Sequence, residues 1–474
     1  MILGWRMRIL LAAAEAFPLA KEGGLGDVVF SLSLALQDLG HEVYLVLPKY
    51  GSIKAAVQDV GKSFAIQLGG YSHTVVLKKT TVKERMPVYL VENEHYFGGQ
   101  EIYGENDLER FLFFSLTIPE VVSQLNPDVI HCHDWHTALA LLWLKKAKMR
   151  LPSVFTIHNL AYQGRFDGRF LYNFGLSQVW GEFVPPGAPK AGLNFISQGI
   201  LLADVITTVS PTYAREILTP ECGEGLEQLL NYRRSQLYGI LNGIDYDEYD
   251  PATDPFLERN YDSTKLEDRK RNKVALQRKS GLPQDVSIPL CGMVTRLEEQ
   301  KGIDLLLRCL DLFVEQTACQ LVILGQGREH YHQLLCHAAK RYPRRIAVFL
   351  EKSEHLGRLV YAGCDIFLMP SRFEPCGLGQ LIAMRYGAVP VVRRTGGLAD
   401  TVKDVAEENG NGFVFENYDA GSMLRAIKRA EEMFRSEQEW RRLMKRNMEL
   451  DFSWKRSAQR YHELYLEIRK ASRN

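Results

Sequence analysis

Short apolar runs alternate with amphipathic helical segments along the chain. The run Met7–Ala13 predicts a buried strand, and Asp27–Leu39 predicts a helix, because its apolar residues recur every three to four positions. Further strands are expected at His41–Leu47, Asp128–Cys132, Val154–Ile157, Val205–Val209 and Leu237–Leu241. Continuous β-branched runs separated by helices are typical of parallel strands that are buried on both faces. The pattern therefore predicts an α/β domain with helices on both sides of a parallel sheet.

The texture changes between Asn242 and Asp254, an aspartate-rich segment that predicts a linker. The alternation then resumes, with strands expected at Ile288–Val294, Gln320–Leu324, Ile346–Leu350, Ile366–Met369, Val389–Val392 and Gly412–Phe415. Lys265–Lys279 is charge-dense and predicts a helix with a solvated face. We expect two Rossmann-like, doubly wound domains that face each other across a cleft, residues 1–243 and 244–452.

Composition limits the classes of partner. The 474 residues carry a net charge of +1, so no global field attracts nucleic acid or an anionic membrane. The eight cysteines are scattered without a Cys-x-x-Cys pair, which fits a reducing cytosol rather than a disulfide framework or a zinc site. The run Ile9–Ala14 could pass for a signal peptide, but Glu15 ends it and a buried strand explains it better. We therefore expect a cytoplasmic protein with no nucleic acid and no membrane partner.

A glycine-rich motif, Lys21–Asp27, lies between the first strand and the first helix. Glycines let a ligand approach the backbone, and a helix N-terminus presents free N–H groups. The motif lacks both the dinucleotide fingerprint and the Gly-Lys-Ser/Thr of a P-loop. It is either a tight strand–helix turn or, with Lys21 in front, an anion or sugar site.

Two motifs follow strands of the same predicted sheet. His131–His136 contains three histidines, which suggests metal, but the spacing from strand into loop has no strong ligand geometry. Asp134 and Trp135 instead suit a sugar, the carboxylate for hydroxyl groups and the ring for a pyranose face. His158 and Asn159 form a similar pair, and open α/β sheets place ligands at these strand ends.

The second half repeats this arrangement with cations. Arg296 and Lys301 follow a predicted strand, a combination that suits a diphosphate, although a surface role is the alternative. Glu374 lies between Phe373 and Pro375 in the loop Pro370–Gln380, where a merely solvating carboxylate would be unusual. Gly377 and Gly379 then open a helix, and the sequence has two more glycine-rich turns, at 325–327 and 395–398.

These motifs together resemble the bacterial glycogen synthases and plant starch synthases, which are retaining glycosyltransferases with the GT-B fold. The family's Lys-x-Gly-Gly-Leu loop is matched by Lys21–Leu25, and its histidine–aspartate–tryptophan strand end by His133–Trp135. Its Arg-Leu-x-x-Gln-Lys-Gly run matches Arg296–Gly302, and its Glu-Pro-Cys-Gly-Leu loop matches Glu374–Leu378. Arg393–Thr401 follows the pattern too, and the likeness extends in order from Met7 to about Lys470.

The resemblance implies transfer of glucose, with retention, from a nucleotide sugar to the non-reducing end of an α-1,4-glucan. It assigns residues 1–243 to the glucan acceptor, completed by a C-terminal helix at 453–474, and residues 244–452 to the nucleotide-sugar donor. The implied catalytic residues are Glu374, His158, Asp134 and Lys21. The implied donor-binding residues are Lys21, Gly23, Gly24, Arg296, Lys301, Cys376, Gly377, Leu378, Gly379 and Lys352. The implied acceptor-binding residues are Glu15, Asp27, Asn159 and Asn242.

Fixed cations can stabilise the charge that grows on a departing diphosphate, so we expect no metal and no other cofactor. ADP-glucose is the expected donor. Lys352 stands where the family usually has an aromatic residue for the donor base, which leaves UDP-glucose or dual donor use as alternatives. Gly379 replaces the family's Thr or Asn. A non-catalytic glucan- or nucleotide-binding relative, a glycosidase and an NAD-dependent oxidoreductase are the remaining alternatives.

Overall fold

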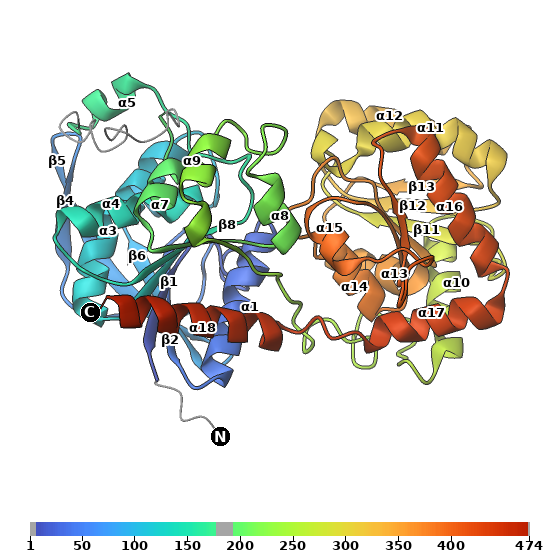
Figure 1. Ribbon diagram of the computed structural model, residues 1–474, viewed down its shortest axis with the longest axis horizontal. Helices are drawn as coiled ribbons and strands as arrows, with labels where there is room; N and C mark the ends of the chain where they lie inside the picture. Colours follow the sequence, from blue (N-terminus) through green and yellow to red (C-terminus); the bar gives the residue numbers. More distant parts are fainter. Residues whose placement is uncertain (1–5, 177–192, 473–474) are drawn as a thin grey trace. The chain divides into compact units, whose positions relative to one another are not determined.

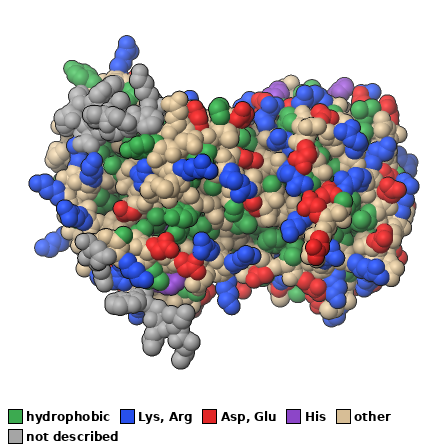
Figure 2. All heavy atoms as spheres, viewed as in Figure 1, with side chains coloured by type: hydrophobic (Ala, Val, Ile, Leu, Met, Phe, Trp, Pro, Cys, Tyr) green, Lys and Arg blue, Asp and Glu red, His purple; other side chains and the backbone are tan. Residues whose placement is uncertain are grey.

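The computed structural model describes residues 6–176 and 193–472, which form two compact units (Figure 1). One unit comprises Met1–Asn242 and Trp454–Asn474, and the other comprises Gly243–Ser453. Within the described ranges, no helix is long and apolar enough to span a membrane. On the visible face in Figure 2, cationic and anionic side chains are interspersed. This mixture accords with the net charge of +1.

The first unit is built on a sheet in the order β10-β9-β8-β7-β1-β2-β6-β5-β3. Its parallel strands confirm the six predicted runs, with the bounds β1 Arg8–Ala12, β2 Glu42–Pro48, β7 Val129–His133, β8 Ser153–Ile157, β9 Val205–Thr208 and β10 Leu237–Gly239. A further parallel strand, β6 (Met86–Glu92), is added. The strand order reverses between β1 and β7. Ligands of open parallel sheets bind at such a reversal, beyond the carboxyl ends of the strands.

An antiparallel edge at β3 (Gln58–Asp59), β4 (Phe64–Leu68) and β5 (Tyr71–Val82) was not predicted. The sequence did carry a signal for it. Half-buried and exposed positions alternate along the first four residues of β4, and Gly69 and Gly70 join β4 to β5 with φ of 60° and 80°. Two adjacent residues with positive φ are what a two-residue hairpin turn needs, and Gly-Gly supplies them without strain.

Helices cover both faces of this sheet (Figure 1). Their bounds are α1 Gly24–Asp38, α2 Glu94–Phe97, α3 Asp107–Leu125, α4 Trp135–Lys146, α5 Gly168–Asn173, α7 Ile196–Leu202, α8 Pro211–Glu216, α9 Glu227–Tyr232 and α18 Trp454–Ala471. The last, α18, belongs to this unit although it ends the chain. Tyr465 on α18 is hydrogen-bonded through its hydroxyl to Nδ1 of His131 at 2.7 Å, and Arg469 pairs with Asp128 at 3.0 Å. These bonds fix α18 against the amino end and the middle of β7.

The second unit has a six-stranded parallel sheet in the order β13-β12-β11-β14-β15-β16. The predicted strands are confirmed as β11 Leu290–Val294, β12 Gln320–Leu324, β13 Ile346–Phe349, β14 Ile366–Met369, β15 Val389–Arg393 and β16 Phe413–Phe415. The helices are α10 Arg269–Lys279, α11 Ile303–Gln316, α12 Glu329–Arg341, α13 Glu354–Gly363, α14 Gly379–Arg385, α15 Gly396–Thr401, α16 Ala420–Phe434 and α17 Glu437–Glu449. Here the order reverses between β11 and β14.

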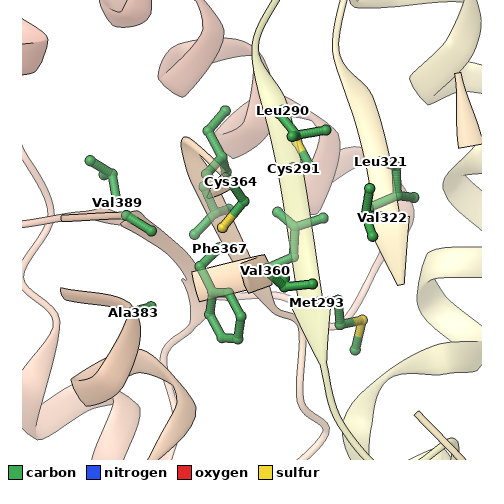
Figure 3. Close-up of a cluster of buried hydrophobic side chains, with 14 of the residues drawn as sticks. Leu290, Cys291, Met293, Leu321, Val322, Val360, Cys364, Phe367, Ala383 and Val389 are labelled. Carbon is green, nitrogen blue, oxygen red and sulfur yellow. The ribbon is translucent and has the colours of Figure 1, made fainter. Parts of the chain in front are cut away.

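The core of this unit is centred on β11 (Figure 3). Gly292 lies in the middle of that strand, and a Cβ built there would stand 2.7 Å from Cβ of Cys364 and 2.8 Å from a methyl of Val360. Glycine therefore lets α13 lie directly against the strand. β11 pairs with β14 in parallel, with Gly292 opposite Phe367, and both strands end at the candidate site.

The expectation for Lys265–Lys279 was partly wrong. Arg269 and Lys273 on α10 are buried, with exposed fractions of 3% and 2%. Lys273 pairs with the buried Asp365 at 2.6 Å, and Arg269 lies 3.8 Å from the same carboxylate. A buried carboxylate needs a counter-ion, and α10 supplies two. The charges of this helix thus serve the interior as well as the surface.

The predicted linker is irregular but tied to the second unit. Arg358 on α13, with 4% of its side chain exposed, forms ion pairs with Glu248 and, at 3.5 Å, with Asp254. The guanidinium also lies 4.1 Å from the ring centre of Tyr249. Arg358 therefore holds the segment 248–254 against α13.

Candidate functional site

The second unit brings the predicted phosphate and sugar residues together where β11 and β14 end. Lys301 lies in a short 3-10 turn, Glu299–Lys301, after β11, and Glu374 lies in the loop after β14. The Lys301 ammonium donates to both carboxylate oxygens of Glu374, at 2.9 and 2.7 Å. Ser371 donates a further hydrogen bond to Glu374 at 3.0 Å, and Glu374 is only 4% exposed. The carboxylate is thus held in one orientation before any ligand arrives.

Glycines allow the loops around Glu374 to approach one another. Gly302 has φ of 75°, and a Cβ there would lie 2.1 Å from the carbonyl oxygen of Pro370. Gly396 has φ of 43°, and its Cβ would lie 2.0 Å from the carbonyl oxygen of Glu374. Both positions combine a backbone conformation that side chains rarely adopt with a contact that leaves no room for one. The glycine-rich turn at 395–398 therefore supports the Glu374 loop from behind.

The glycine-rich turn at 325–327 packs against the loop that carries Arg296. A Cβ at Gly325 would lie 1.8 Å from the carbonyl oxygen of Thr295, and one at Gly327 would lie 2.3 Å from that of Leu297. These glycines pack against the backbone on either side of Arg296. Half of the Arg296 side chain is exposed, and its guanidinium pairs with Glu298 at 3.1 Å.

The remaining donor residues surround this centre at different depths. Cys376 is buried, Gly377 has φ of 75°, and α14 begins at Gly379, directly after the partly buried Leu378. Lys352 is exposed, in the loop between β13 and the start of α13. Lys352 follows β13, and β12 separates β13 from β11 in the sheet. The end of β13 is therefore further along the sheet from the Lys301–Glu374 pair, which lies where β11 and β14 end.

In the first unit, the glycine-rich loop is organised by a buried carboxylate. Glu15 is 2% exposed and accepts hydrogen bonds from the backbone N–H groups of Glu22, at 2.7 Å, and Gly23, at 3.0 Å. Gly23 is the N-cap residue of α1, and Gly24 is its first residue. The structure therefore places Glu15 behind the loop, as its anchor. Its predicted contact with an acceptor stays a prediction.

Lys21 and Asp27 lie at the exposed side of the same loop. Their side chains form an ion pair at 2.7 Å, with exposed fractions of 34% and 25%. The Lys21 ammonium also lies 5.4 Å from the ring centre of Phe17. The structure thus joins a residue predicted for the donor to one predicted for the acceptor.

Asp134 is held in a strained conformation at the end of β7. Its φ of 57° and ψ of −179° belong to a region that is populated almost solely by glycine, and residues are kept there only where the surroundings enforce it. Burial raises the pKa of Asp134 to about 7, against the opposing effect of hydrogen bonds from the backbone N–H groups of His158 and Asn159. The first of these bonds measures 2.8 Å. The strand ends of β7 and β8 are therefore joined through this carboxylate.

His158 is kept neutral by its surroundings. Burial lowers its pKa to about 3, and its Nε2 is hydrogen-bonded to Nδ1 of His133 at 2.9 Å. Asn159 accepts a hydrogen bond from the N–H of Ala161, which closes a local turn. Asn242 is 7% exposed, and its amide oxygen has no hydrogen-bond partner among the described residues. A buried amide oxygen without a partner is unusual and is a good candidate for a ligand contact.

His131, the first residue of the histidine motif, serves the fold. Both ring nitrogens of His131 are used, by Tyr465 and by Thr156. Trp135 is buried, contrary to our expectation of a free ring face: its ring packs on Phe111 and lies where a Cβ on Gly164 would stand. In residues 6–176 and 193–472, no group of three or more His, Cys, Asp or Glu side chains is arranged to hold a metal ion.

Sequence reasoning missed two residues that position the site. Tyr103 donates a hydrogen bond from its hydroxyl to the second carboxylate oxygen of Glu15, and Ser371 holds Glu374. Ser371 lies within the Glu374 motif and could have been found as a hydroxyl three residues before the carboxylate. Tyr103 is 88 residues from Glu15, and no local pattern connects them.

Comparisons with known proteins agree with this geometry. Residues 8–232 match the family model described as starch synthase catalytic domain, and residues 277–447 match glycosyl transferases group 1. A glycogen synthase of Gloeobacter violaceus is 45% identical over 98% of this chain and 99% of its own length. A glycogen synthase of Moorella thermoacetica is 44% identical over 97% of this chain and 96% of its own.

Solved structures show the same likeness. The catalytic domain of starch synthase IV from Arabidopsis thaliana, solved bound to ADP and acarbose, has a TM-score of 0.91 and 35% identity, over 98% of this chain and 100% of that one. A sucrose-phosphate synthase from Thermosynechococcus elongatus shares the fold, with a TM-score of 0.63 and 18% identity, over 98% and 100% of the two chains. The sequence matches, the two doubly wound sheets and the residues at their points of reversal lead to one conclusion: this chain is a glycosyltransferase of the GT-B fold and belongs to the glycogen and starch synthase family.

Proposed function

We propose that this protein is a glycogen synthase that transfers glucose, with retention, from ADP-glucose to the non-reducing end of an α-1,4-glucan. The observation that carries the proposal is the Lys301–Glu374 pair at the reversal between β11 and β14, with Arg296 in the same loop after β11 as Lys301. A glycosidase would need two carboxyl groups flanking the scissile bond, whereas this centre pairs one carboxylate with cations.

The cations serve the leaving group. Glu374 takes two of the three N–H donors of Lys301, and among the described residues the third remains for a phosphate oxygen. Arg296 contributes a planar fork of donors on a half-exposed side chain that can turn toward a diphosphate. Positive groups fixed before the reaction stabilise the negative charge that develops as the glycosidic bond to phosphate breaks.

The carboxylate serves the sugar. Glu374 is oriented by Lys301 and Ser371. In the proposal it accepts hydrogen bonds from hydroxyl groups of the donor glucose. Asp134 and the neutral His158 act on the sugar ring, and Lys21 assists at the phosphates. Asn242, with its unpartnered amide oxygen, contributes to acceptor binding together with Asp27, Glu15 and Asn159.

We propose that no metal ion takes part. Four positions supply the positive charge that Mg²⁺ or Mn²⁺ would otherwise bring to a diphosphate, namely Lys21, Arg296, Lys301 and the N–H groups of the loop at Gly377. Turnover should survive exhaustive treatment with EDTA. A rate that EDTA abolishes and Mg²⁺ restores would contradict this assignment.

The donor base is the least constrained part of the proposal. ADP-glucose is proposed as the donor because the similar starch synthase IV was solved with ADP bound. Lys352 is exposed and cannot stack as a π-surface, although its aliphatic stem can lie on a base. We therefore propose that UDP-glucose is also used, at a lower rate.

The test is a glucose-transfer assay on glycogen with ADP-glucose and UDP-glucose side by side. The wild-type protein should extend glycogen with ADP-glucose, and the Glu374→Ala variant should do so at least ~10²-fold more slowly. Failure of the wild type to transfer from either donor would favour a non-catalytic relative instead. We also propose a cytoplasmic location, because the eight cysteines are scattered without a Cys-x-x-Cys pair. The net charge of +1 supports the proposal that neither nucleic acid nor a membrane is a partner.

A further inference from the structure

The first unit carries exposed tyrosines that its fold does not require. Among the described residues, the large hydrophobic side chains with more than half of their surface exposed are Tyr71 at 73%, Tyr172 at 77% and Tyr232 at 62%, all three in this unit. Single exposed apolar residues are common on protein surfaces and need no explanation. Tyr71 and Tyr172 differ from such cases. Other aromatic rings lie next to Tyr71, and a backbone hydrogen bond joins the segments that carry the two tyrosines.

Tyr71 begins a row of rings that ends in the core. Its ring lies 6.5 Å from that of His73, which stacks on exposed His95 at 5.7 Å between ring centres. His73 and His95 both contact the buried ring of Tyr96. The row is therefore a rigid surface, with its outer rings fixed by an inner one.

Tyr172 joins this surface from another segment. The N–H of Gly69, in the turn before Tyr71, donates a hydrogen bond to the carbonyl oxygen of Phe174 at 3.4 Å, directly after α5. This bond brings the end of α5, which carries Tyr172, to the turn between β4 and β5 (Figure 1). We define Tyr71, His73, His95 and Tyr172 as the aromatic strip.

The segments that form most of the strip lack charge. No Lys, Arg, Asp or Glu occurs between Phe64 and Leu77, nor between Phe170 and Leu176. A surface for nucleic acid or for an anionic ligand would carry cations. The exposed charges closest in sequence, Arg169 before Tyr172 and Glu94 before His95, are of opposite sign. Flat rings with a hydroxyl or ring nitrogen at the edge, in surroundings without a net charge, instead suit a neutral ligand with an apolar face and many hydroxyl groups.

We propose that the aromatic strip binds a stretch of α-1,4-glucan remote from the reacting end. This inference rests on the proposed function, in which the acceptor is a polymer that extends well beyond the site of transfer. Glucose units stack on Tyr71 and Tyr172, and their hydroxyl groups are hydrogen-bonded to the edges of the histidine rings. The strip thereby holds a large branched glucan on the enzyme between transfers.

The experiment compares glycogen with maltotriose as acceptors for wild type, Tyr71→Ala, Tyr172→Ala and the double variant. Tyr232→Ala is the matched control, since it removes an equally exposed tyrosine from α9 in the same unit. Binding is measured as retardation in native gels that contain glycogen, and activity as kcat and KM for each acceptor. We expect the double variant to bind glycogen about five- to tenfold more weakly and to show a matching rise in KM for glycogen. Its kcat and KM with maltotriose should be unchanged, and Tyr71→Trp should retain binding.

Two results would overturn the inference. One is unchanged retardation of the double variant, and the other is an equal loss in Tyr232→Ala. A parallel rise in KM for maltotriose would place these tyrosines in the reacting acceptor site and would also contradict a remote strip. The proposed function fails separately, if the wild type transfers glucose to neither acceptor while still being retarded by glycogen through the strip.

Discussion

The two units have the same strand order around their sites, but the side chains at those sites differ in their state of charge. In the second unit, where the strand order reverses between β11 and β14, the side chains of the site are charged: Lys301, Glu374 and Arg296. In the first unit, where the strand order reverses between β1 and β7, burial favours the neutral forms of the side chains at the strand ends. Burial lowers the pKa of His158 to about 3 and raises that of Asp134 to about 7.

The difference shows how little the doubly wound fold dictates about a site. Both sheets offer strand ends at a reversal, and both use glycines to bring loops close together. The side chains at those ends decide whether the site is a charged one for a diphosphate or a nearly neutral one for hydroxyl groups. The comparison predicts that charge removal will damage the second unit's function most, and that acid will damage the first unit's stability most.

The largest expected effect is at Glu374. Glu374→Ala should lower turnover by ~10²-fold or more, about 3 kcal/mol, because the oriented carboxylate is lost at the donor sugar. The substitution also leaves the Lys301 ammonium without its counter-ion, so the melting temperature should fall by a few degrees. Glu374→Gln, which keeps the side-chain volume and one acceptor oxygen but not the charge, separates the loss of charge from the loss of the side chain. Turnover near that of the wild type in both variants would remove Glu374 from the mechanism.

Next come the cations. Lys301→Ala should reduce kcat/KM by about ten- to a hundredfold and Arg296→Ala by about tenfold, because each weakens charge stabilisation at the diphosphate. The double variant should lose less than the product of the two factors, since both groups act on one leaving group. Steady-state kinetics of the four proteins measure this coupling. Full activity of both single variants would mean that the cluster is only surface charge.

Acid should act on the first unit. Burial lowers the pKa values of His131, His133, His136 and His158. Below pH 6.5 the unfolded chain takes up protons that these folded histidines refuse, so stability falls as the pH falls. Each fully buried histidine contributes at most about 1.4 kcal/mol per pH unit.

Asp134 works in the opposite direction. Its folded pKa lies above the unfolded value, so its contribution improves as the pH falls from about 7 toward 4. With four such histidines and one such aspartate, the free energy of unfolding should fall by a net amount on the order of 1 kcal/mol between pH 7.0 and pH 6.0. Hydrogen exchange at pH 7.0 and 6.0, corrected for intrinsic rates, should show protection lost in β7 and β8 before β11 and β14. Equal losses in both units would contradict the comparison.

The smallest effect is expected at Lys352, which lies at the margin of the charged site. Lys352→Tyr should raise the preference for ADP-glucose over UDP-glucose by about fivefold, which corresponds to ~1 kcal/mol for stacking at an exposed position. The ratio of kcat/KM values for the two donors measures it, with Lys352→Ala as the control for loss of the lysine alone. An unchanged ratio in Lys352→Tyr would show that this residue does not choose the donor.

Much of the fold could be predicted from local pattern. The apolar runs that became β1, β7, β11 and β14 were found within two residues, because a strand buried on both faces is a continuous apolar run. The hairpin of β4 and β5 was missed because it lies at a sheet edge, where β4 is a short, mostly apolar stretch of five residues and β5 mixes polar with apolar residues instead of forming a continuous apolar run. The motif residues Glu374 and Lys301 were also found, since both stand in short patterns next to strands.

The sequence by itself determined the two doubly wound sheets, the family and the residue types at each strand end, because these depend on periodicity and short motifs. Only the tertiary structure decided how those residues are used. Lys301 and Glu374 are 73 residues apart and meet only because β11 and β14 are neighbours in the sheet. Trp135 became core rather than a sugar platform, and Arg269 and Lys273 were buried by the need of Asp365 for counter-ions. Burial and long-range pairing depend on which elements pack together, and no local pattern contains that information.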